Sequence, residues 1–598
     1  MTIVVLSPSG RETGEKLAKA LEMELHARSA PADRVFTEVA EHLRDLFTIG
    51  SPILFVGAAG ALIRILAPLL ADKEAEPPVL AIAEDGSAVV PLLGGHHGAN
   101  DLARRAGEAL GIAPSITTAS DLSLGVALDN PPAGWHLAPG TDYKSVAAAL
   151  LAGEPAAIDP ALDWLTDADL KRDDAAGCQI TASVKIADAA PKSLTYHPER
   201  LALGVGCERD AEPEELIRLV EETLAENNLA PEAIAAVYSI DVKMDEAAMH
   251  ALGAHIGRPV RFFDAARLEE ETPRLATPSD VVFREVGCHG VSEGAALAAA
   301  GPDAALIVPK RKSKRATCAI AEAPALIDTA TTGIARGQLA LVGIGPGADF
   351  WRTPEADAAI RNAEVIVGYG LYIDLLGPLA AGKERHDFAL GEEEKRAAYA
   401  LDLAAEGKSV VLVSSGDIGI YAMATLVYEL LDKAGRKDWE RLHVWVTPGI
   451  SALQACAARI GAPLGHDFCT ISLSDLLTPW EAIQQRVKAA AEGDFVISFY
   501  NPVSMRRRTQ LAYAREVLLQ HRPPETPVIL GRSLGRDEEK ITVTTLQDLS
   551  VDQVDMLTLV MVGSSETRFN GKHVYTPRGY AGKAGTSIRA DKSSEAAQ

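Results

Sequence analysis

Three glycine-rich turns constrain the fold of this chain more than any other feature. They read GIGPG at 343–347, SGDIGIY at 415–421 and PGISA at 448–452, and each directly follows a short apolar run. Apolar runs that end in glycine and precede helical patterning are typical of buried parallel strands. The carboxyl ends of such strands can line one crevice, where open α/β sheets bind ligands. Because glycine allows close approach of the backbone and a positive φ, the pattern predicts a small cofactor held by main-chain groups.

The composition narrows the class of partner. With 598 residues the chain is too long for a single hydrophobic core, which predicts several domains. Lys and Arg total 58 against 82 Asp and Glu, and the net charge of −24 disfavours nucleic acid and anionic membranes. The six cysteines include no CxxC pair, which disfavours a zinc or iron–sulfur site and a disulfide framework. We therefore expect no metal, no nucleic acid and no membrane partner.

The most apolar stretch, residues 52–71, is nearly long enough to span a membrane. Arg64 lies in its middle and glycines stand at 57 and 60, which favours a strand, a tight turn and a buried helix instead. The start of the chain lacks the basic region and cleavage pattern of a signal peptide and has the pattern of a strand. The sequence therefore predicts a cytoplasmic protein.

Strand and helix patterns alternate along the chain, which predicts a multidomain α/β fold. The stretch 323–337 has no clear period and contains Pro, Thr and Gly, as expected of a linker. The tail is small and polar, as in disordered segments. We expect two small α/β domains at 1–125 and 201–322, a looser middle segment at 126–200, the linker at 323–337, a final α/β block at 338–580 and a disordered tail at 581–598.

The first turn formally satisfies the G-x-G-x-x-G/A pattern of dinucleotide-binding domains through Gly343, Gly345 and Ala348. In such a domain the next strand, here at 364–370, would end in an acidic residue that holds the ribose, but it ends in Gly-Tyr-Gly. The TPE at 353–355 has the pattern of a helix N-cap and first turn, so the helix would begin well after the glycines. A nicotinamide oxidoreductase is therefore the weaker alternative.

Five separated motifs in 338–580 agree with one family. The three turns are followed by SFYNP at 498–502 and GRSLGRDEE at 531–539, and this order and spacing resemble the tetrapyrrole methylases that use S-adenosyl-L-methionine. GHDFCTISLSDLLTPW at 465–480 and YTPRGY at 575–580 resemble one branch, the precorrin-3B C(17)-methyltransferases. The resemblance implies a two-lobed class III methylase fold, S-adenosyl-L-methionine as cofactor, a tetrapyrrole (corrin precursor) as substrate and a homodimer through this half.

The resemblance also implies which residues contact the cofactor. A glycine taken alone could serve only a tight strand-to-helix turn. Asp417 is more informative, because a carboxylate inside a glycine turn loses solvation free energy unless a hydrogen-bond donor contacts it. The implied contacts are Gly345, Pro346, Ser415, Gly416, Asp417, Ile420, Ser451, Ala452, Asn501, Gly531 and Arg532.

Methyl transfer from a sulfonium to carbon needs chiefly in-line positioning and a water-poor site. The resembled branch also couples this transfer to contraction of the macrocycle, and contraction needs an acid or a base. The candidates are His466, Asp467, Asp475 and Glu539, with the histidine first because the ordinary pKa of imidazole lies nearest neutrality. The basic run 506–508 would either bind substrate carboxylates or be a solvated helix start.

The N-terminal half resembles a second family. GAAGALIRILAPLLADK at 57–73 and GGHHGANDLA at 94–103 are similar to the N-terminal part of cobalt-precorrin-5A hydrolases, and LGVGCERD at 203–210 and VGCHGVSEGAALAAAG at 286–301 to their C-terminal part. That family opens a lactone on the ring-contracted corrinoid and releases the excised carbon as acetaldehyde. Lactone opening needs an activated water or general base and stabilisation of an oxyanion. The candidates are His96, His97, Glu293, His289, Asp241, Lys243 and Asp245.

The leading interpretation is a two-part protein of cobalamin (corrin ring) biosynthesis. Its C-terminal half would methylate precorrin-3B, or the cobalt form, at C(17) with ring contraction, and its N-terminal half would open a lactone. The alternative makes the N-terminal half a non-catalytic corrinoid-binding or accessory module. The basic tract 310–315 would bind side-chain carboxylates in either case, or protect a strand edge.

Overall fold

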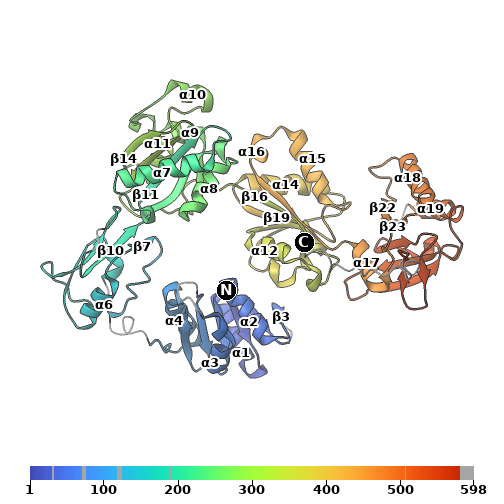
Figure 1. The fold of residues 1–598 in the computed structure, drawn as a ribbon, viewed down its shortest axis with the longest axis horizontal. Helices are drawn as coiled ribbons and strands as arrows, with labels where there is room; N and C mark the ends of the chain where they lie inside the picture. Colours follow the sequence, from blue (N-terminus) through green and yellow to red (C-terminus); the bar gives the residue numbers. More distant parts are fainter. Residues whose placement is uncertain are drawn as a thin grey trace, which may run out of the picture. The chain divides into compact units, whose positions relative to one another are not determined.

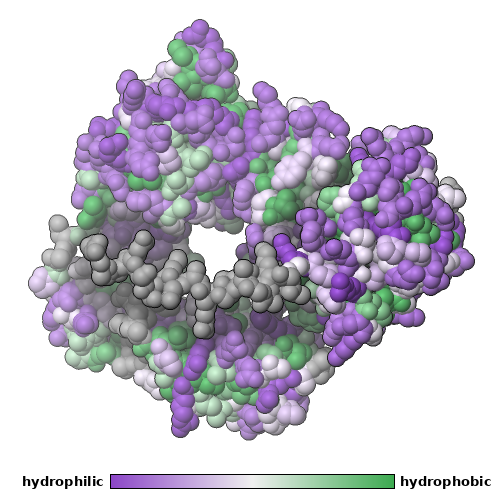
Figure 2. Space-filling view, turned by 45° about the vertical axis from the view of Figure 1, so that its right-hand side comes forward, coloured by the Kyte–Doolittle hydropathy of each residue, from purple (hydrophilic) through white to green (hydrophobic). Residues whose placement is uncertain are grey.

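The computed structural model describes residues 1–29, 32–70, 76–117, 124–166, 168–187, 190–504 and 507–579, apart from the side chains of His96 and Pro378. The chain forms two compact units, Met1–Arg336 and Gly337–Gln598. Sheets with helices on their faces recur in both units, so the predicted α/β class is confirmed (Figure 1). Hydrophilic residues dominate the surface seen in Figure 2.

The first sheet has the order β3-β2-β1-β4-β5-β6, and only β6 runs antiparallel to its neighbour. Two hydrophobic clusters cover its two faces: α1 and α4 supply one, and α2 and α3 the other. The elements are β1 (Thr2–Val5), β2 (Glu24–Ala27), β3 (Arg34–Val35), β4 (Ile53–Val56), β5 (Val79–Ile82), β6 (Val89–Leu93), α1 (Arg11–Leu21), α2 (Val39–Thr48), α3 (Ala59–Leu66) and α4 (Ala99–Leu110).

The apolar stretch at 52–71 is divided between two elements, as predicted. It forms the buried strand β4, a turn at Gly57 and the helix α3. Leu62 and Leu66 of α3 are buried, whereas Arg64 is exposed. Among the described residues, no helix combines the length and the apolar character that crossing a bilayer requires.

A four-stranded sheet of order β7-β10-β9-β8 lies in the middle segment. Helix α6 (Tyr143–Leu151) packs on it through Val146 and Leu150. Its strands are β7 (Trp135–Leu137), β8 (Ala156–Ile158), β9 (Cys178–Ala182) and β10 (Ser193–Pro198).

The third sheet has the order β13-β12-β11-β15-β14, with α7 and α8 on one face and α11 on the other. Helix α11 (Ser292–Ala300) consists almost entirely of small residues and is buried along its whole length. This composition allows close approach, because a Cβ on Gly204 of β11 would lie 1.9 Å from the carbonyl oxygen of Ser292. The other elements are β11 (Leu201–Cys207), β12 (Ile234–Ile240), β13 (Val260–Phe263), β14 (Ala305–Lys312), β15 (Ala316–Glu322), α7 (Pro213–Glu226), α8 (Ala247–Ile256), α9 (Ala265–Glu269) and α10 (Asp280–Val286).

The second unit begins with a fully parallel sheet of order β18-β17-β19-β16-β20. Alternate strand residues enter opposite cores: Leu339 and Leu341 pack under α14 and α15, and Ala340 and Val342 under α12. The elements are β16 (Gln338–Gly343), β17 (Val365–Tyr369), β18 (Glu384–Phe388), β19 (Ser409–Ser414), β20 (His443–Thr447), α12 (Pro354–Asn362), α13 (Gly370–Asp374), α14 (Glu393–Ala405) and α15 (Met423–Ala434).

The second lobe of this unit is built on a mixed sheet of order β22-β23-β26-β24-β25. Helices α18 and α19 cover one face and α17 the other. The elements are β22 (Phe468–Ser472), β23 (Val496–Tyr500), β24 (Pro527–Arg532), β25 (Lys540–Thr545), β26 (Thr558–Val562), α17 (Ala452–Ile460), α18 (Trp480–Glu492) and α19 (Thr509–Leu519).

Candidate functional site

The three glycine turns lie at the carboxyl ends of three adjacent strands, β19, β16 and β20. This is the arrangement that the sequence predicted. The first two turns bond to each other through their main chains: the N–H of Gly345 donates to the carbonyl of Gly416 at 3.1 Å, and the reverse bond measures 2.7 Å. The third turn joins them, because the N–H of Gly449 donates to Oδ2 of Asp417 at 3.1 Å. The turns therefore form one structural unit at this edge of the sheet.

Two of these positions require glycine for different reasons. Gly416 has a φ of +71°, in the left-handed region that side chains rarely adopt. Gly449 has no such φ, but a Cβ there would lie 2.1 Å from the carbonyl oxygen of Gly416. A main-chain atom cannot move aside cheaply, so close packing of the turns depends on the missing side chain.

Helix α12 begins well after the first turn. Thr353 is its N-cap, with the side chain accepting from the N–H of Ala356 at 3.2 Å, and Pro354 is its first residue, as predicted. Strand β17 ends at Tyr369 and continues into Gly370. The first turn therefore presents no helix N-terminus to a pyrophosphate and no acidic residue to a ribose, which argues against the dinucleotide alternative.

Asp417 has main-chain donors on both carboxylate oxygens. Oδ1 accepts from the N–H of Gly419 at 2.8 Å, and Oδ2 accepts from Gly449. The solvation cost that made this residue conspicuous in the sequence is therefore offset within the chain itself. Its first role is to hold the second and third turns together, and any contact with a cofactor would use its remaining lone pairs.

Ser451 and Tyr500 connect the third turn to strand β23. Ser451 caps α17 by accepting from the N–H of Leu453 at 3.2 Å, and its Oγ lies 2.6 Å from the hydroxyl of Tyr500. That hydroxyl also accepts from the N–H of Leu453 at 3.1 Å. Burial raises the pKa of Tyr500, although its hydrogen bonds oppose the shift. Tyr500 lies in the SFYNP motif but has no role in the sequence-based prediction; its hydrogen bonds show that the hydroxyl orders the start of α17.

The two lobes of the second unit contact each other on both sides of the turns. On one side, Nε of Arg536 lies 3.4 Å from the carbonyl oxygen of Pro346. On the other, the hydroxyl of Tyr421 donates to the carbonyl of Thr470 at 3.0 Å, and the Tyr421 ring lies 5.3 Å from that of Tyr500. The turns therefore lie where the two lobes meet.

The remaining cofactor candidates lie at or beside these contacts. Ser415 donates through Oγ to the carbonyl of Gly345 at 3.4 Å, and the N–H of Ile420 donates to the carbonyl of Asp417 at 3.2 Å. Ala452 is the first residue of α17. Asn501 is exposed, with Nδ2 donating to Ser472 at 3.2 Å. A Cβ on Gly531 would lie 2.8 Å from the sulfur of Cys456 on α17, and Arg532 donates to Asp555 at 2.6 Å.

The catalytic candidates of this half contact different partners. His466 is exposed, and its Nδ1 accepts from the N–H of Asp467 at 2.9 Å. Asp475 accepts from Gln510 at 3.1 Å and lies 3.7 Å from Arg507. Glu539 accepts from Arg459 at 2.7 Å and from the N–H of Gly535 at 2.6 Å, contacts that suit a structural role. Of the basic run 506–508, Arg506 lies outside the described residues.

In the N-terminal half, Glu293 is 2% exposed, and both of its carboxylate oxygens accept hydrogen bonds. Its Oε1 accepts from the N–H of Lys310 at 2.8 Å and from the hydroxyl of Thr277 at 3.0 Å, while Oε2 accepts from the N–H of Thr277 at 2.9 Å. These contacts tie together three segments and favour a structural role. His97 is exposed, and the side chain of His96 lies outside the described part of the structure. His289 is oriented by Glu269, whose Oε1 lies 2.9 Å from Nδ1.

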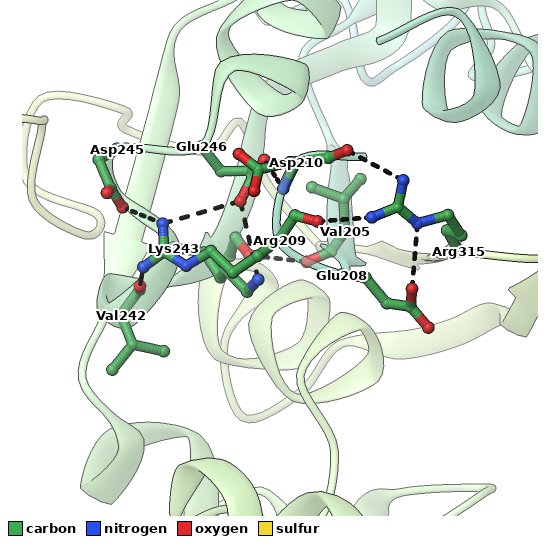
Figure 3. A network of polar contacts seen from close by, with 10 residues as sticks. Val205, Glu208, Arg209, Asp210, Val242, Lys243, Asp245, Glu246 and Arg315 are labelled. Carbon is green, nitrogen blue, oxygen red and sulfur yellow. Dashed lines mark hydrogen bonds and ion pairs between the residues drawn. The ribbon is translucent and has the colours of Figure 1, made fainter. Parts of the chain in front are cut away.

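A network of charged residues lies at the carboxyl ends of β11 and β12 (Figure 3). Arg209 donates to Asp245 and to the carbonyl of Val242, both at 2.6 Å. Arg315, which precedes β15, donates to Glu208 at 3.0 Å and to the carbonyl of Arg209 at 2.6 Å. The strands β11 and β12 are parallel, and the carboxyl ends of parallel strands form the edge at which open α/β sheets bind ligands.

Glu246 lies at the centre of the network, and its side chain is 4% exposed. Its Oε1 accepts from the N–H of Asp210 at 3.0 Å, whereas Oε2 accepts no hydrogen bond within the described residues. Lys243 and Arg209 each place a nitrogen 3.7 Å from Oε2. Burial, and then the charge of Glu246, raise the pKa of the neighbouring Cys207 to about 11, so this thiol is neutral near pH 7. Nothing in the sequence distinguishes Glu246 from the other acidic residues of this acid-rich chain.

The first domain has a cavity of about 410 Å³ at the carboxyl ends of β4 and β5. Glu84 lines it and accepts from the hydroxyls of Ser7 and Ser9 at 2.6 and 2.5 Å, and these hydrogen bonds lower the pKa of Glu84. The other lining residues are Gly57, Ala58, Ala59, Ala81, Ile82, Ala83 and Val90, most of them small or apolar.

Three family profiles match the chain in succession. Residues 41–121 match the N-terminal domain of cobalamin synthesis protein G, 201–321 match the C-terminal domain of the same protein, and 338–550 match the tetrapyrrole (corrin/porphyrin) methylases. The methylase match agrees with the position of the three turns. The cobalamin synthesis G matches agree with the resemblance found in the N-terminal half.

Among curated proteins, a precorrin-3B C(17)-methyltransferase from Sinorhizobium sp is 47% identical over 251 residues, which are 41% of this chain and 98% of the relative. The chain spans only about half the length of two other curated relatives, 46% of one and 50% of the other. The solved structure of the methyltransferase CobJ is 41% identical and covers 40% of this chain and 100% of its own, with a TM-score of 0.39. The solved structure of CobE, a protein from the cobalamin biosynthetic pathway, is 41% identical and covers 21% of this chain and 89% of its own, with a TM-score of 0.20. The chain belongs to the tetrapyrrole methylase family, and its N-terminal half carries the two cobalamin synthesis G domains.

Proposed function

We propose that the C-terminal half transfers a methyl group from S-adenosyl-L-methionine to C(17) of precorrin-3B, or of its cobalt form, with contraction of the macrocycle. The observation that carries this proposal is the junction of three glycine turns at adjacent strand ends. These turns lie in the part of the chain that is 47% identical to such an enzyme, over 98% of that enzyme and 41% of this chain. The substrate class is therefore the tetrapyrroles. A homodimer formed through this half of the chain and a cytoplasmic location stay predictions.

The residues at the turns fit this cofactor. Main-chain groups and small side chains there would receive a mostly polar molecule, and Ser415, Gly416, Ile420 and Ala452 would hold it. When bound, the cofactor supplies a methyl group already activated by the sulfonium. The chain needs to hold donor and acceptor in line and to keep water out, which the lobe contacts through Tyr421 and Arg536 favour.

Single-turnover methylation tests the proposal. The full chain would be incubated with precorrin-3B made by the upstream enzymes and with methyl-labelled S-adenosyl-L-methionine, and the pigment analysed by mass and by nuclear magnetic resonance. One label at C(17) is expected. Label at another carbon, or binding of NAD in place of S-adenosyl-L-methionine in calorimetry, would overturn the assignment.

We further propose that the N-terminal half opens a lactone on the ring-contracted corrinoid, at the carboxyl ends of β11 and β12. Each cation there already lies near a carboxylate: Arg209 near Asp245 and Glu246, Lys243 near Glu246 and Arg315 near Glu208. Because its cations are already paired, the site suits a neutral acceptor such as an ester carbonyl better than a free carboxylate. The ammonium of Lys243 would meet the charge that develops on the carbonyl oxygen when water adds.

Acetaldehyde release separates this proposal from the alternative of a non-catalytic corrinoid-binding module. The full chain would be given the ring-contracted lactone, and Lys243→Gln would be compared with Lys312→Gln, which alters an exposed lysine of the basic tract. Loss of release in Lys243→Gln alone supports the site. Equal loss in Lys312→Gln would move the site to the tract, and absence of release from a wild-type chain that binds the pigment would favour the accessory module.

A further inference from the structure

A buried arginine of the first lobe has no oxygen acceptor in the part of the chain that the structure describes. Arg396, near the start of α14, is 4% exposed. Within the described residues its Nε and Nη1 make no hydrogen bond. Its Nη2 donates to the sulfur of Met423 at 3.1 Å, and the nearest carboxylate, on Glu393, is 4.0 Å away. Since a thioether is a weak acceptor, most of the N–H groups of this guanidinium have no adequate partner.

Arg522, in the same unit, is a buried arginine with a structural role and serves as a comparison for Arg396. It has the same exposure, 4%, but it donates to three carbonyl oxygens, those of Gly563, Ala490 and Phe495. These bonds join β26, α18 and the start of β23, so the charge of Arg522 is solvated by the main chain. Arg396 has no comparable set, and packing alone does not explain a charged group at its position.

The environment of Arg396 is electrostatically unbalanced. Burial lowers its pKa, and Glu393 opposes this shift only from a distance. A buried cation without acceptors destabilises the protein unless an anion joins it. The guanidinium is therefore suited to bind an anionic oxygen that approaches from outside the lobe.

The position of Arg396 indicates where that anion comes from. Helix α14 follows β18 and packs on the parallel sheet, so its first turns lie at the carboxyl edge that carries the glycine turns. Met423, which Arg396 contacts, begins α15 directly after the second turn. Tyr372, whose pKa is raised by burial, is influenced by the charges of both Arg536 and Arg396. Arg536 comes from the other lobe and reaches the first turn at Pro346. Two cations, one from each lobe, therefore lie near Tyr372 on α13.

We propose that Arg396 binds a carboxylate of a ligand of the methylase half. The inference rests on the proposed function, whose two reactants both carry carboxylates: the amino-acid end of S-adenosyl-L-methionine and the side chains of the tetrapyrrole. Arginine is the side chain best suited to carboxylates, through charge-assisted hydrogen bonds. Arg396 is thus a recognition residue that the sequence motifs did not reveal.

Calorimetry on the full chain distinguishes the two sources of carboxylate. The probes are S-adenosyl-L-methionine, its decarboxylated analogue and uroporphyrin III, a stable octacarboxylated tetrapyrrole, and the variants are Arg396→Met and Arg396→Lys. If the cofactor supplies the carboxylate, the wild type discriminates against the decarboxylated analogue by about tenfold, and Arg396→Met abolishes the discrimination. If the tetrapyrrole supplies it, affinity for the cofactor stays unchanged and uroporphyrin III binds about tenfold more weakly. Arg396→Lys, which keeps the charge, should be intermediate in either case.

Arg568→Met, which alters an exposed arginine of the second lobe, is the matched control and should change neither affinity. Unchanged binding of all three probes in Arg396→Met and Arg396→Lys would overturn the inference while leaving the methylase proposal intact. A wild-type chain that binds neither S-adenosyl-L-methionine nor uroporphyrin III would overturn both. Thermal unfolding of each variant, and the Arg396→Lys result, separate loss of recognition from loss of folding.

Discussion

The glycine turns of the methylase half and the charged network at the ends of β11 and β12 are built in opposite ways. The turns approach each other so closely that no side chain fits at Gly449, and main-chain bonds join them together with the carboxylate of Asp417 and the hydroxyl of Ser415. The network consists of long side chains, from segments as far apart as Arg209 and Arg315, whose charges are paired. A site made from main chain is sensitive to added volume, whereas a site made from side chains is sensitive to lost charge. The two halves should therefore respond differently to mutation.

The largest effect is expected for Gly449→Ala. The added Cβ would lie 2.1 Å from the carbonyl oxygen of Gly416, and the third turn must move to accommodate it. We expect affinity for S-adenosyl-L-methionine to fall more than about 100-fold and the free energy of unfolding of the second unit to fall by about 3 kcal/mol. Calorimetry and urea unfolding measure the two effects. Gly177→Ala, where a Cβ meets nothing within 4 Å, should change neither.

Asp417→Ala is expected to act next most strongly. It removes the acceptors for the N–H groups of Gly419 and Gly449 and separates the second and third turns. Affinity for S-adenosyl-L-methionine should fall by about 10- to 100-fold, equivalent to about 1.4–2.8 kcal/mol. Asp417→Asn, which keeps one oxygen acceptor, should lose less. Equal affinity in the wild type and Asp417→Ala would show that the turns hold without the carboxylate.

Glu246→Gln tests the side-chain site by the opposite kind of change, because it conserves volume and removes charge. Lys243 and Arg209 would lose the carboxylate that lies between them. We expect the free energy of unfolding of the first unit to fall by about 1–2 kcal/mol, less than for a fully buried pair because Arg209 is half exposed. Affinity for S-adenosyl-L-methionine should not change, and a change there would contradict the separation of the two sites.

The smallest effect concerns Cys207. Because burial and Glu246 raise its pKa from 9.0 to about 11, little thiolate forms in the folded protein below pH 9. A thiol whose pKa is raised by folding destabilises the native state only as pH rises above 9.0, since the unfolded chain ionises first. Alkylation of Cys207 by iodoacetamide at pH 8, followed by peptide mass spectrometry, should therefore be slow. It should accelerate about two- to fivefold in Glu246→Gln, which removes one of the charges that raise the pKa.

The sequence predicted the turns well because glycine at a strand end has few alternative explanations. The spacing of GIGPG, SGDIGIY and PGISA indicated three strand ends, and TPE at 353–355 indicated the late start of α12, which the structure confirms. The cofactor roles of the individual turn residues stay predictions. Arg396 and Glu246 were not found, because their significance lies in which acceptors or donors they lack, and a single sequence does not contain that information.

The catalytic candidates show the same limit of prediction from a single sequence. His97, Glu293 and Glu539 were chosen for residue type, and type does not report partners. Glu293 and Glu539 accept hydrogen bonds that connect the segments around them. From the sequence alone, a carboxylate with this structural role cannot be told apart from a general base. Their proposed catalytic roles therefore need measurements of activity, and the observed bonds make loss of stability the more informative control.

Helix α11 has a consequence for how this part of the chain can change during evolution. Every residue from Ser292 to Ala300 is buried, and the helix approaches β11 so closely that even a methyl group on Gly204 would collide with it. At its small positions we therefore expect volume to decide which substitutions are tolerated, with exchanges among glycine, alanine and serine accepted more readily than larger side chains. In a comparison of distant homologues this segment would look like uninformative alanine-rich sequence, although we expect it to tolerate fewer substitutions than an exposed position such as His97.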